Sequence, residues 1–102
     1  MKLTKSTIIL SFFVLGLQFI VFGQYEQLDR EWKQYYNEGK GDSALITALS
    51  IKYWTLEHQG DTSLNYANSY LSIGKSYKLL KSYDSAKSNF LNFLTIHVAI
   101  FI

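Results

Sequence analysis

The chain has 102 residues, of which 17% are aromatic and 18% charged, and it contains neither cysteine nor proline. This length allows one small domain, and the lack of cysteine excludes a disulfide-held core and a lipid-modified cysteine. The formal net charge is +2, and it falls to zero when Lys2 and Lys5 are set aside. No basic stripe is present that would favour nucleic acid, whose binding depends on phosphate neutralisation.

The N-terminal segment has the pattern of an export signal. Lys2 and Lys5 precede an apolar run from Ile8 to Phe22, and the small residue Gly23 follows before the chain turns polar. This order is typical of a secretory signal peptide. It predicts cleavage after Gly23 and a periplasmic or extracellular location. A permanent membrane helix needs about 20 apolar residues, so a retained anchor on a helical hairpin is the alternative. The expected division is residues 1–23 as signal peptide and residues 24–102 as a helical domain.

Apolar residues recur at helical spacing after the signal, which predicts an all-α fold. Helices are expected near residues 25–38, 43–58, 63–80 and from 85 toward the C-terminus. Spacings of three and four place large or small apolar residues on one face of each helix. The expected inner faces are Leu28, Trp32, Tyr35 and Tyr36 in the first helix, Ala44, Ala48 and Ile51 in the second, Tyr66, Tyr70, Ile73 and Tyr77 in the third, and Ala86, Phe90, Phe93, Leu94 and His97 in the fourth.

Polar residues and glycine mark the expected helix ends. Asp42 and Asp84 are predicted N-caps, because a carboxylate can accept the free amide hydrogens of a first turn. Gly60 is predicted to close the second helix in the left-handed conformation, and Asp61 or Thr62 to cap the third. Lys81 and Ser82 are expected to form a short turn.

The two halves of this domain are related by a repeat. Asp-Ser-Ala occurs at residues 42–44 and again at 84–86, an offset of 42. The same shift places Tyr35 on Tyr77 and Trp32 on Gly74. The sequence therefore predicts a repeated pair of helices.

The second pair resembles the tetratricopeptide repeat, a helix-turn-helix unit with aromatic, glycine and alanine positions at set intervals. The matching residues, expected to pack the repeat, are Tyr70, Ile73, Gly74, Tyr77, Tyr83, Ala86 and Phe90. Phe93 and Val98 depart from the family pattern, which has alanine and proline there. The period of 42 and the stretch GDTSLNYANSYLSIGKSY are similar to the kinesin-light-chain-like subtype of bacterial arrays. The first repeat is expected near residues 25–60 and the second near 62–102.

The resemblance implies antiparallel helix pairs of an α-solenoid, with the exposed side of each first helix lining a groove for a protein or peptide partner. A glycine inside a helix costs about 1 kcal/mol relative to alanine, so Gly74 is expected to permit a close approach near Ala86. The groove positions carried over from the family are Lys33, Tyr36, Asn37, Asn68, Leu71, Lys75 and Lys78. Lys33 and Lys75 are 42 residues apart and would favour an acidic partner segment, the alternative being ordinary solvated lysines.

No catalytic, cofactor-binding or metal-binding residue is expected, and no small-molecule substrate. His58 and His97 have no metal-ligand neighbour at i+4, and no Gly-x-Ser-x-Gly turn occurs. Residues 73–78, IGKSYK, contain Gly-Lys-Ser, but Ser69 stands where a phosphate loop needs its earlier glycine.

The C-terminal sequence VAIFI differs from the polar helix that usually closes a repeat array. Two repeats are also fewer than the three usually needed to bury a stable core. We expect either a truncated N-terminal portion of a longer array or a chain that covers its end by pairing. The alternative to a stand-alone scaffold is the sensory part of a larger protein with a kinase, a transcriptional regulator or a caspase-like peptidase.

Overall fold

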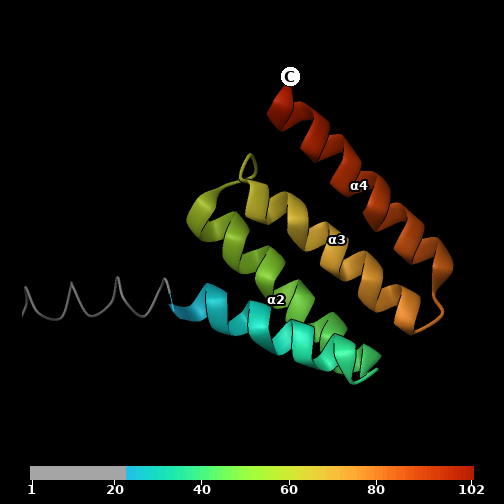
Figure 1. Cartoon of the computed structure of the whole chain (residues 1–102). Coiled ribbons are helices and arrows are strands. Elements are labelled where there is room, and N and C mark those ends of the chain that lie inside the picture. The colour runs from blue at the N-terminus through green and yellow to red at the C-terminus, as the bar shows by residue number, and fades with distance from the viewer. Residues whose placement is uncertain (1–22) are drawn as a thin grey trace, which may run out of the picture.

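The computed structural model describes residues 23–102, and this part of the chain is all-helical, with no strand (Figure 1). The first helix occupies residues 23–37. It is followed by α2 (Gly41–Gln59), α3 (Leu64–Leu79) and α4 (Tyr83–Phe101). The expected all-α class is confirmed. The expected signal peptide lies outside the described residues except for Gly23, so its presence and cleavage stay predictions.

Successive helices run antiparallel and lie side by side (Figure 1). The ring of Tyr25, near the start of the first helix, lies 5.7 Å from that of Trp54 near the end of α2. At the other end, Gly41 begins α2 against the Leu80 side chain that follows α3. Because the loops between them are short, consecutive helices of this length pack as antiparallel neighbours.

The first helix and α3 are parallel and joined by two side-chain hydrogen bonds. The Tyr25 hydroxyl donates to Asn65 Oδ1 at 3.1 Å, and Trp32 Nε1 donates to Ser76 Oγ at 2.9 Å. The second bond is buried. The two first helices of the expected repeats are therefore direct neighbours.

The core lies where the first helix, α2 and α3 meet. Its buried cluster consists of Trp32, Ala44, Ala48, Ile51 and Ile73. The two alanines are fully buried, and their small side chains leave room for the indole ring between the helices. The expected inner faces of the first three helices supply all five of these residues. Of the partly buried residues packed around them, Tyr25, Leu45 and Leu49 lie outside the expected faces.

The helices recur at a fixed interval. The bounds of α4 are those of α2 shifted by 42, since 83 − 41 and 101 − 59 are both 42. The first helix ends at 37 and α3 at 79, again a difference of 42. A repeated helix pair is therefore compatible with the structure as well as with the Asp-Ser-Ala alignment.

The predicted N-caps are wrong, whereas Gly60 closes α2 as expected. The residues preceding α2 and α4 are Lys40 and Ser82, and neither makes a side-chain cap hydrogen bond. The amides of Ala44 and Ala86 bond to the carbonyls of Lys40 and Ser82, so these helices begin earlier than expected. Asp42 and Asp84 instead lie in the first turn, where a carboxylate interacts favourably with the helix dipole.

The cap of α3 is Ser63, whose Oγ accepts the amide hydrogen of Tyr66, rather than Asp61 or Thr62. Gly60 has a positive φ of 90° but a ψ of 168°. It therefore occupies an extended region open to glycine and not the left-handed helical region that was expected. Lys81 has a φ of 62° in the turn predicted between α3 and α4.

The expected inner face of α4 is correct at Ala86, which is buried, but wrong at Leu94, which is 52% exposed. Tyr83, expected to pack the repeat, is 62% exposed. Both residues lie on the side of α4 that α3 does not cover.

Candidate functional site

α3 and α4 approach each other closely at Gly74. A Cβ atom added there would lie 2.5 Å from Cε1 and 2.6 Å from Cδ1 of Phe90. Real Cβ atoms do not approach other atoms this closely, so the ring occupies the space that a side chain at position 74 would need. Ala86, one turn earlier in α4, is 3% exposed. Gly74 thus lies where the sequence analysis expected the helices to approach, with Phe90 directly against it.

Trp32 is the centre of the packing between the first helix and α3. Its indole N–H donates to Ser76 Oγ, which itself donates to the Ser72 carbonyl at 2.8 Å. The ring stacks on Tyr36, with centroids 5.1 Å apart and planes 20° apart. The Lys75 ammonium lies 6.0 Å from the indole centroid, within the range of a cation–π interaction.

The seven expected groove residues lie on the first helix and on α3. We call them the candidate binding face: Lys33, Tyr36, Asn37, Asn68, Leu71, Lys75 and Lys78. Tyr36 and Lys75 are brought together by Trp32, which both contact. The side chains of Lys33, Asn37 and Lys78 are exposed, and those of Asn68 and Leu71 are partly exposed.

The two lysines expected to act together have different surroundings. Lys33 forms a salt bridge of 2.8 Å with Asp29, and this hydrogen bond raises the pKa of Lys33. Lys75 forms no salt bridge with any residue of the described chain and lies over Trp32 instead. Lys75 is therefore the lysine whose charge is less compensated.

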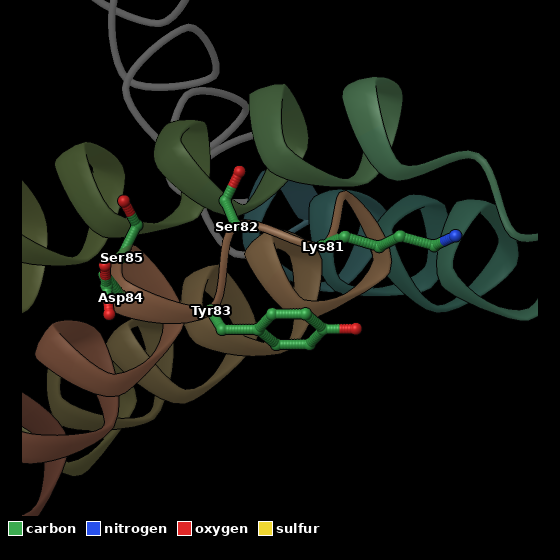
Figure 2. Close-up of a pocket in the computed structure, with 5 residues that line it drawn as sticks. All are labelled: Lys81, Ser82, Tyr83, Asp84 and Ser85. Atoms are coloured by element: carbon green, nitrogen blue, oxygen red, sulfur yellow. The ribbon is translucent and has the colours of Figure 1, made fainter.

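Three surface hollows lie away from the candidate binding face. They measure about 470, 370 and 320 Å³. The largest is formed by the turn between α3 and α4, and Figure 2 shows the Lys81 and Tyr83 side chains extending to one side of this turn and Asp84 and Ser85 lying on the other. These side chains diverge, so they do not form a set of polar groups around one ligand.

The histidines lie against aromatic rings. The ring of His58 stacks 4.4 Å from that of Trp54, and its Nδ1 is 2.9 Å from the Trp54 carbonyl. The ring of His97 lies between those of Phe93 and Phe101, with centroid distances of 5.3 and 4.8 Å. Residues 23–102 contain no group of histidine and acidic side chains arranged to hold a metal ion. Within the same part of the chain, no helix has the length and apolarity needed to cross a bilayer.

Sequence reasoning missed the bond between Trp32 and Ser76. A buried indole usually finds an acceptor for its N–H, which is a signal that one is present. The period alone could not say which of the serines in α3 supplies it, because several lie within reach of the same helix face.

No family model, curated protein or solved structure matches this chain. Its function is therefore inferred from its residues and its structure alone.

Proposed function

We propose that this chain is an exported, tetratricopeptide-like helical repeat module that holds a protein or peptide partner and has no catalytic activity of its own. The observation that carries the proposal is the recurrence of the helices at 42 residues. The contact of Phe90 with Gly74 supports it, because the glycine and the aromatic residue are repeat positions of that family. Export rests on the signal-like pattern of residues 1–23.

The candidate binding face has the chemistry to hold an extended acidic segment. Tyr36, which stacks on the buried Trp32, provides an aromatic surface, and Lys75 adds a positive charge beside it. Asn37 and Asn68 provide amides that can both donate and accept hydrogen bonds to a peptide backbone. An acidic segment would also compete with Asp29 for Lys33.

A second candidate is the N-terminal sensory portion of a larger protein with a kinase, regulator or peptidase domain. The apolar side chains exposed along α4 favour it, because further repeats would cover them. Any catalytic activity would then belong to those other domains.

Selection from a displayed library of random peptides tests the proposal. We expect the chain to enrich acidic peptides and the Lys33→Glu/Lys75→Glu variant to lose them, because both charges of the face are reversed. The matched control is Lys81→Glu/Lys87→Glu, which reverses two exposed lysines outside the face and should retain the enriched peptides.

Helix content measured by circular dichroism must be the same in all three chains for the comparison to count. Enrichment no greater than on a blank support would overturn the proposed function. Equal loss in both double variants would remove the assignment of the candidate binding face and leave only a general charge effect.

A further inference from the structure

The side chain of Gln24, near the start of the first helix, is held against α2. Its Oε1 accepts a hydrogen bond from Trp54 Nε1 at 3.1 Å, whereas its Nε2 has no hydrogen-bond partner within residues 23–102. The two residues border a surface hollow of about 320 Å³, which is also lined by Gln27, Leu28 and Ser50. The carbonyl oxygen of the Gln24 amide is therefore fixed, while the amide nitrogen is exposed and free.

Export would make Gln24 the first residue of the mature chain. The proposed cleavage after Gly23 gives Gln24 a free α-amine. This amine would lie at the N-terminal end of the helix of residues 23–37, where the partial positive charge of the helix dipole disfavours an ammonium group. The neutral amine, which is the nucleophilic form, is favoured instead.

We propose that the mature N-terminus closes to a pyroglutamyl residue at Gln24, a covalent modification that rests on the proposed export. The α-amine attacks Cδ of the same residue, so that an N–Cδ bond forms and the Cδ–Nε2 bond breaks. Nε2 leaves as ammonia and takes a proton from the amine. The reaction needs no oxidant, reductant or second substrate. Its product is a neutral lactam, which removes the charge from the positive end of the helix dipole.

Trp54 is placed to assist this closure. As the amine adds to Cδ, negative charge develops on Oε1, and the indole N–H donates to that atom. A donor directed at the oxygen on which charge develops stabilises the transition state. Neighbouring rings fix the indole, since its centroid lies 4.4 Å from that of His58 and 5.7 Å from that of Tyr25. Trp54 is therefore expected to accelerate the reaction.

The hollow beside Trp54 suits the lactam better than an ammonium group. Leu28 and the indole provide apolar surface, and none of the side chains that line the hollow is acidic, so none can pair with a positive charge. Aminopeptidases require a free α-amine, so the closed ring would also protect the exported chain from these enzymes.

Mass spectrometry of the exported chain tests the proposal. The full chain, with residues 1–23, is produced in a Gram-negative bacterium without a glutaminyl cyclase, collected from the periplasm and incubated at neutral pH for several days. We expect a product that begins at residue 24 and is lighter than the open chain by one ammonia molecule. The control is Gln24→Asn, whose side chain is one methylene shorter and cannot form an unstrained lactam. It should keep the mass of its open chain.

The rate of ammonia loss tests the part played by Trp54. We expect Trp54→Phe to slow the closure about threefold or more, because it removes the donor to Oε1 and keeps an aromatic ring. Tyr53→Phe changes a neighbouring residue of α2 that is 62% exposed, and it should leave the rate unchanged. Closure that is equally fast in all three chains would overturn the role of Trp54.

The ways in which the proposal can fail are distinguishable. A mature chain that begins at Gln24 and keeps the mass of the open chain would overturn the modification and leave export intact. A chain that begins at any other residue would overturn both the modification and the proposed cleavage after Gly23. Peptide binding by the candidate binding face is measured separately and depends on neither result.

Discussion

At position 74 the backbone of α3 lies so close to the Phe90 ring that there is no room for a side chain larger than the hydrogen of glycine. The cost of glycine in a helix is about 1 kcal/mol. Full burial of an aromatic side chain removes roughly 150–250 Å² from water, so even the partial burial of Phe90 offsets this cost. The glycine is therefore retained for packing and not for helix propensity.

Gly74→Ala should destabilise the chain. Overpacking a well-filled contact costs about 1–3 kcal/mol, and the gain in helix propensity returns about 1 kcal/mol of it. We expect a net loss of about 1 kcal/mol in the free energy of unfolding, measured by urea denaturation followed by circular dichroism.

Repeating Gly74→Ala in a Phe90→Leu variant tests whether the loss of stability comes from a collision with the Phe90 ring. Gly74→Ala should cost less there, because a smaller side chain leaves room for the added methyl group, and the double-mutant cycle measures the difference. An unchanged cost in that background would mean that Phe90 is not the residue with which the methyl group collides.

The bond between Trp32 and Ser76 gives a second prediction at this scale. Ser76→Ala leaves the buried indole N–H without its acceptor and should cost about 1–3 kcal/mol. Ser50→Ala is the control, because Ser50 Oγ donates to a carbonyl one turn back, as Ser76 does, but is exposed. Urea denaturation followed by tryptophan fluorescence measures both. An equal loss in the free energy of unfolding for both variants would mean that the hydrogen bond to Trp32 adds nothing to stability.

At the scale of the helices, two serines that precede helices have different roles. Ser63 accepts the amide hydrogen of Tyr66 and so caps α3, and its own hydroxyl donates to the Gly60 carbonyl. Ser82 precedes α4 without any side-chain cap bond. Residue type alone does not distinguish them, because the backbone at the cap decides whether the oxygen can reach an amide.

Ser63→Ala should therefore lower the free energy of unfolding by about 1 kcal/mol, the usual value of an N-cap. Ser82→Ala should change it by less than about 0.5 kcal/mol, as is usual at exposed surface positions. Thermal melting of the two variants compares them directly. A larger effect at residue 82 than at residue 63 would contradict the assigned caps.

For the molecule as a whole, alkaline pH should loosen the contact between the first helix and α3. Burial, followed by the nearby charge of Asp29, raises the pKa of Tyr25, whose hydroxyl donates to Asn65. Because the folded state holds this proton more tightly than the unfolded state, the stabilisation is present below pH 10 and is lost as the pH rises through the folded pKa.

We expect the melting temperature to fall as the pH rises above about 10, the unperturbed tyrosine pKa, and Tyr25→Phe to reduce the size of that fall. Tyr53→Phe, which changes a tyrosine that is 62% exposed, is the control and should behave as the unmodified chain does. An identical pH dependence in all three chains would show that Tyr25 does not link stability to pH in this range.

The sequence by itself determined the helices and their interval, because apolar spacing and the Asp-Ser-Ala repeat are local patterns. It also identified Gly74 as a position of close approach, since a helix tolerates a glycine there only for a packing reason. The seven residues of the candidate binding face could be placed on their helices in the same way. Their role stays a prediction.

Only the tertiary structure decided which apolar side chains are covered. Leu49 and Leu91 stand at equivalent places in similar helices, yet one is partly buried and the other is half exposed. The reason is that burial depends on whether a neighbouring helix is present. The α3 helix lies on α2, whereas no described helix lies on the side of α4 that carries Leu91. The partner of Trp32 and the cap at Ser63 were decided in the same way, because each depends on the distance and direction between groups that the folded backbone brings together.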